Sequence, residues 1–203
     1  MMMKGKAKNK NLSKIEELTS FFFEVGTLRK IARSHRQTLL TDDLSDSIAS
    51  HSFRVAIIGY FLAKEVGADS DKVIKMCLLH DIEESRAGDQ NWVHKKYVKV
   101  FENEIREEQL GKIPHSQELL SLSKEYDEKK SLEAKVAKDS DLLDQILLLR
   151  EYEWVGNKEA KRWLDGEAQG KRIYNQAARQ IVKEIYKQKP SLWWHNLWTS
   201  DRR

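Results

Sequence analysis

Three residues that can bind a metal or transfer a proton lie together in MCLLHDIEES, residues 76–85. His80 and Asp81 directly follow an apolar run, and Glu84 comes three residues later. Imidazole nitrogens and carboxylate oxygens are the ligands that divalent metals commonly take from proteins. A histidine and an aspartate in a place that apolar side chains would fill more favourably therefore indicate a candidate metal site.

Two further residues of these types lie within apolar helical patterns. His51 precedes Val55, Ile58 and Leu62 by four, seven and eleven residues. Helical spacing therefore puts His51 on the face that turns toward the core. Asp141 lies in KVAKDSDLLDQILLLREYEW among leucines and isoleucines. A carboxylate there is costly unless it is paired or binds a metal.

Each of these residues also has a simpler explanation. A histidine on an apolar face is usually a hydrogen-bonded core residue. Asp141 has Lys138 and Arg150 within reach as ion-pair partners. Two imidazoles and two carboxylates on three separate helices nevertheless form the nitrogen and oxygen set of a divalent metal site. The candidate ligands are His51, His80, Asp81 and Asp141.

The segments that contain these candidate ligands are predicted to be helical. The chain has only two prolines and nine glycines in 203 residues, which favours long helices over a turn-rich β protein. We expect an all-α fold with Ser45 or Ser47 capping the second helix. The expected helices cover about 12–35, 46–66, from Ser70 onward, 96–110, 115–129 and 131–155, with one or two more before Pro190. In the first of them Ile15, Leu18, Phe22, Val25 and Leu28 would face the core.

The length suits one domain. We divide the chain into a flexible basic arm (1–11), a helical bundle (12–189) and a Trp-rich tail (190–203) that packs on the domain or on a dimer partner. Cys77 is the only cysteine, so no intramolecular disulfide can form; this fits the cytoplasm, and Cys77 reads as a core residue. No run approaches the roughly 20 apolar residues of a membrane span. A net charge of +4 permits an anionic ligand without indicating nucleic acid.

Three segments in this order, ASHSFRVA, LLHDIEESRAGD and AKDSDLLDQ, resemble the HD-domain metal-dependent phosphohydrolases. The branch that they resemble most contains the 5′-deoxynucleotidases. The resemblance implies a single-domain helical bundle that acts as a homodimer and releases phosphate from (deoxy)nucleoside 5′-monophosphates. It also implies one divalent ion per chain, such as Mn, Co, Mg or Zn, bound by the four candidate ligands.

The same resemblance suggests roles for the neighbouring residues. Glu84 would orient the attacking water or relay protons, and Asp89 would contact the sugar hydroxyl or assist the leaving group. Glu83 would lie behind the ligands or face solvent. In LRKIAR the family's phosphate-binding arginine corresponds to Arg33, with Arg36 a nearby competitor. Either guanidinium would bind phosphate as a bidentate fork.

The sequence differs from this family pattern at positions that bear on substrate choice. Ser50 stands where relatives carry an acidic residue, and the loop QNWVHKKYVKV lacks the expected proline. RSHRQ has no tryptophan beside the phosphate arginine to crowd the sugar, whereas Ser34 or His35 offers a hydrogen bond to a 2′-hydroxyl. We therefore expect a weak preference for deoxyribose over ribose, with Trp92 the first suspect if a steric wall exists.

Two other functions remain open from the sequence. A binuclear HD phosphodiesterase would need extra histidines, for which His94 and His115 are the candidates. A non-enzymatic helical interaction protein would use the aromatic tail as its binding surface. That tail, PSLWWHNLWTSDRR, contains Trp193, Trp194 and Trp198.

Overall fold

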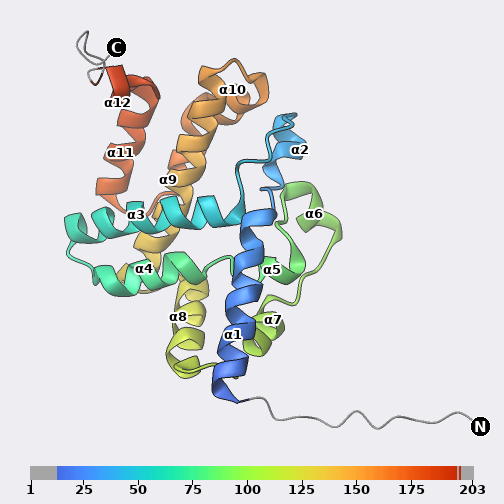
Figure 1. Cartoon of the computed structure of the whole chain (residues 1–203). Helices are drawn as coiled ribbons and strands as arrows, with labels where there is room; N and C mark the ends of the chain where they lie inside the picture. Colours follow the sequence, from blue (N-terminus) through green and yellow to red (C-terminus); the bar gives the residue numbers. More distant parts are fainter. Residues whose placement is uncertain (1–12, 196, 198–203) are drawn as a thin grey trace, which may run out of the picture.

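The computed structural model describes residues 13–195 and 197, which form a bundle of helices (Figure 1). The α-helices are α1 Lys14–Val25, α2 His35–Leu39, α3 Ile48–Val66, α4 Ser70–Leu79, α5 Glu84–Ala87, α6 Trp92–Tyr97, α7 Glu102–Leu110, α8 Ser116–Glu128, α9 Leu132–Trp154, α10 Lys158–Leu164, α11 Gln176–Lys187 and α12 Leu192–His195. Three 3-10 turns join them: η1 Gly26–Lys30, η2 Asp165–Glu167 and η3 Gly170–Arg172. Over these residues the backbone forms no strand, only an isolated bridge between Ala32 and Ser47. The all-α prediction is confirmed.

The centre of the bundle is formed by α3, α4 and α9, which pack against one another, with α8, α10 and α11 packed on α9 (Figure 1). Their facing side chains are fully buried, as at Val55, Val73 and Leu143. Gly59 allows α3 and α4 to approach closely, because a Cβ there would lie 2.8 Å from Sγ of Cys77. Cys77 is buried in the core, as predicted.

The central helices begin with well-formed caps. Ser47 caps α3, and the hydroxyl of Ser50 accepts the backbone N–H of Ser47 at 2.8 Å. This reciprocal pair is a capping box, with Ser50 in the position usually held by Glu or Gln. Ser131 caps α9, because its hydroxyl accepts the N–H of Ala134. Both caps fix the helices on which the candidate site residues lie.

The prediction of a single helix over 12–35 is wrong. α1 ends at Val25, a 3-10 turn follows, and the chain is extended before Arg33. Tertiary hydrogen bonds explain the break, because Arg33 N–H donates to Asp46 O at 2.8 Å and Ile48 N–H donates to Ile31 O at 3.0 Å. These bonds replace helical ones and hold the segment of Arg33 against the beginning of α3.

The expected apolar face of that helix is also only partly right. Leu18 and Val25 pack against the core, as does Phe21, which was not expected there. Ile15 and Phe22 are instead 77% and 62% exposed. A short helix that contacts the bundle near its C-terminal half needs only a narrow apolar stripe.

Two further boundaries differ from the prediction. The helix expected over 96–110 is divided into α6 and α7, and Val98 between them is extended. The predicted helix from Ser70 ends at Leu79, so Glu84 lies on the separate helix α5 rather than one turn further along α4. The expected helices at 46–66, 115–129 and 131–155 are confirmed as α3, α8 and α9.

The ends of the chain leave two expectations open. The arm expected over 1–11 and Trp198 of the tail lie outside the described residues. Trp193 and Trp194 are 76% and 45% exposed, so the packing of the tail on the domain or on a partner stays a prediction. Among the described helices, none combines the length and the apolar character needed to cross a bilayer.

Candidate active site

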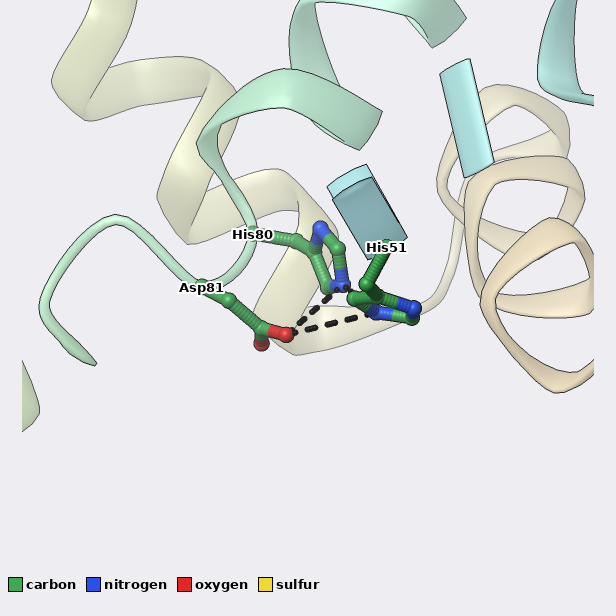
Figure 2. A group of neighbouring side chains, drawn as sticks. All are labelled: His51, His80 and Asp81. Carbon is green, nitrogen blue, oxygen red and sulfur yellow. Dashed lines mark hydrogen bonds and ion pairs between the residues drawn. The ribbon is translucent and has the colours of Figure 1, made fainter. Parts of the chain in front are cut away.

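His51, His80 and Asp81 present their ligand atoms to one point, within 4.8 Å of one another (Figure 2). Nε2 of His80 lies 3.1 Å from both Nε2 of His51 and Oδ2 of Asp81. Asp141 joins the group from α9, with Oδ1 at 3.4 Å from Nε2 of His51 and 3.9 Å from Nε2 of His80. The four candidate ligands from the sequence therefore converge in space.

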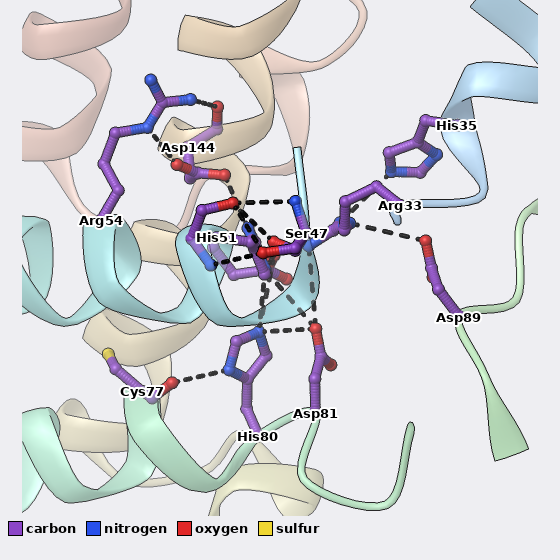
Figure 3. Close-up of polar contacts among 12 residues, drawn as sticks. Arg33, His35, Ser47, His51, Arg54, Cys77, His80, Asp81, Asp89 and Asp144 are labelled. Atoms are coloured by element: carbon purple, nitrogen blue, oxygen red, sulfur yellow. Dashed lines mark hydrogen bonds and ion pairs between the residues drawn. The ribbon is translucent and has the colours of Figure 1, made fainter. Parts of the chain in front are cut away.

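Both imidazole rings are fixed from behind (Figure 3). Nδ1 of His51 lies 2.6 Å from Oδ2 of Asp144, and Nδ1 of His80 lies 2.8 Å from the carbonyl oxygen of Cys77. Both partners accept, so Nδ1 of each ring donates, and each Nε2 points into the site, where it can offer a lone pair once it has lost its proton. This orientation is typical of histidines that bind metals.

The sequence analysis did not identify Asp144, although the structure gives it a clear position. It is buried on α9, three residues after Asp141, and Arg54 of α3 donates to its second carboxylate oxygen. Two signals in the sequence point to this arrangement. Asp144 shares a helical face with Asp141, and Arg54 follows His51 at the same three-residue spacing.

The ionisation of the group reflects strong coupling of opposite charges. Burial and the charge of Arg33 act to lower the pKa of His51, but hydrogen bonds to Asp141, Asp144 and Asp81 raise it well above its usual value. Burial likewise opposes the ionised forms of Asp81 and Asp141. Interactions with neighbouring side chains, led by His80 for Asp81 and Lys138 for Asp141, nevertheless hold both carboxyl pKa values well below their usual range. The carboxylates are therefore negative, and protonated His51 and Lys138, or a bound cation in place of the proton of His51, can balance their charge.

This donor set fits a divalent metal. Two imidazole nitrogens face each other at 3.1 Å, where one proton or one metal ion can be shared between them. Asp81 and Asp141 supply the negative charge that such a cation requires. Lys138 donates to Oδ2 of Asp141 at 2.6 Å, which leaves Oδ1 turned toward the histidines.

Arg33 lies at the side of this group, and its side chain is almost fully buried. Its Nη1 lies 3.8 Å from Oδ2 of Asp81, and its Nε lies 3.5 Å from Oδ2 of Asp89. Neither nitrogen has a hydrogen-bond partner among the described residues. Burial opposes the charge of Arg33, but Asp81 and Asp89 raise its pKa, so a guanidinium with free donors faces the site.

The other arginine candidate lies elsewhere. Arg36 is on α2 and lines a separate hollow with Gln37, Thr41 and His94. The structure therefore brings Arg33, and not Arg36, beside the four candidate ligands. Neither His94, in that hollow, nor the exposed His115 lines the cavity at the metal group.

The two acidic candidates near Arg33 differ in their surroundings. Asp89 accepts the backbone N–H of Ser34 at 2.6 Å, so it positions the segment that carries Arg33. Glu84 lines the cavity, and its buried Oε2 has no hydrogen-bond partner in the part of the chain that the structure describes. Burial and the charges of Asp81 and Asp89 raise the pKa of Glu84 to about 10. Glu84 is thus a carboxyl group able to hold a proton.

Glu83, unlike Glu84, has its carboxylate bound by an arginine. It is buried, and Nη2 of Arg106 donates to it at 2.9 Å while Nε donates at 3.1 Å. Arg106 also pairs with Asp127 at the end of α8. Glu83 also lines the cavity, but its carboxylate is engaged by Arg106 and ties the turn after His80 to α7 and α8.

A cavity of about 380 Å³ opens beside the candidate ligands, a size suited to a small-molecule ligand. His80, Asp81, Asp141, Arg33 and Glu84 line one part of it. Residues from other elements complete the lining, among them Gln90, Trp92, Lys95, Gln145 and Arg172. The cavity is thus lined by candidate metal ligands, by an arginine that is suited to bind phosphate, and by the aromatic side chain of Trp92.

Comparison with known proteins places this geometry in context. A family model described as HD domain matches residues 25–186. The 5′-deoxynucleotidase HDDC2 of Dictyostelium discoideum is 32% identical over 55% of this chain, and the match spans 65% of that protein. HDDC2 of Bos taurus is 28% identical over 71% of this chain and 72% of its own.

A solved structure from Magnetospirillum magnetotacticum MS-1, described as a "predicted metal-dependent phosphohydrolase", is similar in fold. Its TM-score is 0.65 with 27% sequence identity, and the alignment covers 86% of this chain and 94% of that one. The similarity extends over the described bundle and is not confined to the segments around the histidines.

Proposed function

The chain belongs to the HD-domain family, and from this premise we propose that it is a metal-dependent phosphohydrolase acting on nucleoside 5′-monophosphates. The products would be a nucleoside and inorganic phosphate. Curated relatives named 5′-deoxynucleotidase support this substrate class. The observation that carries the proposal is a buried guanidinium with free donors beside a convergent set of two imidazoles and two carboxylates.

The proposed metal ligands are His51, His80, Asp81 and Asp141. A divalent ion held by them would lower the pKa of a bound water and neutralise charge on the phosphoryl group. Asp144 and the carbonyl of Cys77 hold the two histidine rings so that each Nε2 faces the ion. The identity of the ion is left to experiment.

Arg33 would bind the equatorial oxygens of the phosphate, since its Nε and Nη1 have no hydrogen-bond partner within the described chain. Asp89 would keep that arginine in place by accepting the N–H of Ser34 and facing Nε of Arg33. Glu84 would exchange a proton with the attacking water or the leaving 5′-oxygen. Each role uses a group that lines the same cavity.

Two expectations about the whole protein accompany this proposal. We infer a cytoplasmic location from the lone buried Cys77, because free thiols persist in reducing compartments. We also keep the homodimer as a prediction, to be tested by light scattering of the purified protein.

The test is phosphate release from a panel of ribo- and deoxyribonucleoside 5′-monophosphates after chelation and separate add-back of Mn, Co, Mg and Zn. We expect no release after chelation and recovery with at least one metal. Release of phosphate from 3′-monophosphates or cyclic diesters in preference to 5′-monophosphates would contradict the proposal. So would turnover that continues unchanged when chelation has removed all metal.

A further inference from the structure

Two side chains from distant parts of the chain form a cation–π contact at the wall of the active-site cavity. Trp92 is the first residue of α6, and Arg172 is the last residue of η3. The guanidinium carbon of Arg172 lies 5.9 Å from the centroid of the Trp92 ring. Both line the cavity that contains Arg33 and Asp81. Because Trp92 is 62% exposed, its indole is available to a ligand and is not a core side chain.

The position of Trp92 is fixed relative to the phosphate-binding arginine. Asp89 accepts the N–H of Ser34 at 2.6 Å, and Nδ2 of Asn91 donates to the carbonyl oxygen of Ser34 at 3.0 Å. The segment before Trp92 therefore binds both the N–H and the carbonyl oxygen of Ser34, the residue that follows Arg33. Three residues of chain reach at most about 11 Å, a span comparable to the length of a nucleotide. The Cα of Trp92 therefore lies within about 11 Å of the Cα of Asp89, the residue beside Arg33.

The cap of α6 makes this arrangement rigid. Oδ1 of Asn91 accepts the backbone N–H groups of Val93 and His94, at 2.9 and 3.2 Å. Asn91 is itself buried, and its amide also donates to Gln37 at 2.9 Å. One side chain thus joins the beginning of α6 to the segment after Arg33. A wall held in this way can position a ligand that the arginine binds at its other end.

We propose that Trp92 is the surface on which the nucleobase stacks, with Arg172 completing that wall. The inference rests on the proposed function and adds the part of the substrate that the metal group and Arg33 do not contact. A flat indole and a flat guanidinium both bind the face of a base by stacking. Stacking tolerates all bases, because each has a π face. The enzyme should therefore accept purine and pyrimidine monophosphates and discriminate against phosphomonoesters that lack a base.

The chain supplies a matched control for this pair. Arg150 forms a cation–π contact with Trp154, with the same 5.9 Å between guanidinium carbon and ring centroid. Trp154 is 45% exposed on α9 and does not line the active-site cavity. Truncation of Trp154 therefore removes the same kind of contact without removing the proposed base wall.

The experiment compares the variants Trp92→Ala, Trp92→Phe, Arg172→Ala and Trp154→Ala with two kinds of substrate. For nucleoside 5′-monophosphates, Trp92→Ala should raise KM about tenfold to a hundredfold with little change in kcat. For ribose 5-phosphate, which has no base, KM should not change. Trp92→Phe should retain most of the affinity, and Arg172→Ala should give a smaller rise in KM.

Three results would overturn the base wall. These are an equal KM increase for ribose 5-phosphate, an equal increase in Trp154→Ala, or no increase in Trp92→Ala. Calorimetric binding of AMP and ribose 5-phosphate to the same variants gives a second readout that needs no turnover. If the wild-type protein hydrolyses no phosphomonoester, the proposed function fails, while the binding difference between the two ligands still decides the role of Trp92.

Discussion

Asp144 lies 2.6 Å from Nδ1 of His51, so that the ring turns Nε2 toward His80, Asp81 and Asp141. The carboxylate does not reach the metal position itself. It fixes which nitrogen of His51 carries the proton and how the ring is rotated. Arg54 donates to the other carboxylate oxygen of Asp144. Two residues of α3, His51 and Arg54, therefore bind one aspartate of α9.

Asp144→Asn should weaken metal binding about tenfold to a hundredfold, since the amide lacks the charge that makes His51 a strong ligand. Competitive metal titration would measure this change, with circular dichroism confirming that the helices remain. Glu151→Gln is the control, because Glu151 also pairs with Arg54 but is exposed. Equal metal affinity in wild type and Asp144→Asn would exclude the positioning role.

Asp141→Ala should abolish bound metal and turnover together. The substitution removes one of the two negative ligands while leaving α9 a good helix former at that position. Metal content per chain and phosphate release measure the two effects on the same sample. A folded Asp141→Ala protein with full metal occupancy would remove Asp141 from the ligand set.

Glu84→Gln should keep the metal and lose most of the turnover, about a hundredfold or more, because an amide cannot transfer a proton. Its buried Oε2 without a partner in the described chain indicates a group kept free for this task. Steady-state kinetics and metal content together test this prediction. Turnover equal to wild type would place the proton transfer on another residue.

The periodic pattern predicted the helices that carry His51 and Asp141 and the helix that His80 and Asp81 directly follow, and the physical reason lies in the burial of these helices. On α3 and α4 the apolar residues around His51 and His80 repeat at helical spacing, because one face of each helix packs in the core. Asp141 was recognisable for the same reason, as a charge within an apolar stretch. These features depend on local sequence and burial alone.

The sequence could not predict the features that depend on contacts between distant segments. Gly26 marks the end of α1 in the sequence, but the extended segment before Arg33 is held by the N–H of Arg33 donating to Asp46 O, a contact that the sequence does not indicate. The spacing of Asp144 from Asp141 and of Arg54 from His51 is visible in the sequence, but only the packing of α3 on α9 joins Asp144 to His51 and Arg54. Trp92 and Arg172 are eighty positions apart, and only the fold brings them together.

Paired ribo- and deoxyribonucleoside 5′-monophosphates should differ by less than about a hundredfold in kcat/KM. The residue after Arg33 is Ser34, and no indole follows to crowd a 2′-hydroxyl. His35 lines the cavity, and its Nε2 lies 3.3 Å from Nη2 of Arg33. Competition assays with both sugars in one vessel give the ratio directly. A larger preference for deoxyribose would require a steric wall, and Trp92→Ala should then relax it.

The stability of the protein should fall as the pH falls from 6.5 toward 4, in part because of His35. Burial and the charge of Arg33 lower the pKa of His35 from 6.5 to about 4. Across that window the unfolded chain binds the proton and the folded chain does not, so acid favours unfolding, by up to about 3 kcal/mol.

His35→Gln should flatten this part of the pH dependence, because glutamine has no proton to bind. Urea denaturation at a series of pH values gives the free energy of unfolding for both proteins. The substitution His115→Gln, at an exposed position, controls for the loss of one imidazole. Parallel curves for wild type and His35→Gln would show that His35 does not contribute.

Three aspartates of α9 contact two different segments of the chain, because Asp141 and Asp144 face His51 whereas Asp139 faces the start of α11. Asp139 accepts the N–H groups of Tyr174 and Asn175, Asp141 faces the histidines, and Asp144 accepts from His51. Inserting or deleting one residue between them would turn the rest of the helix by about 100°. Homologous proteins can therefore differ in residue type between Asp139 and Asp144, but not in the length of this segment. Gaps in an alignment of relatives should fall in the connections around α9 and never between Asp139 and Asp144.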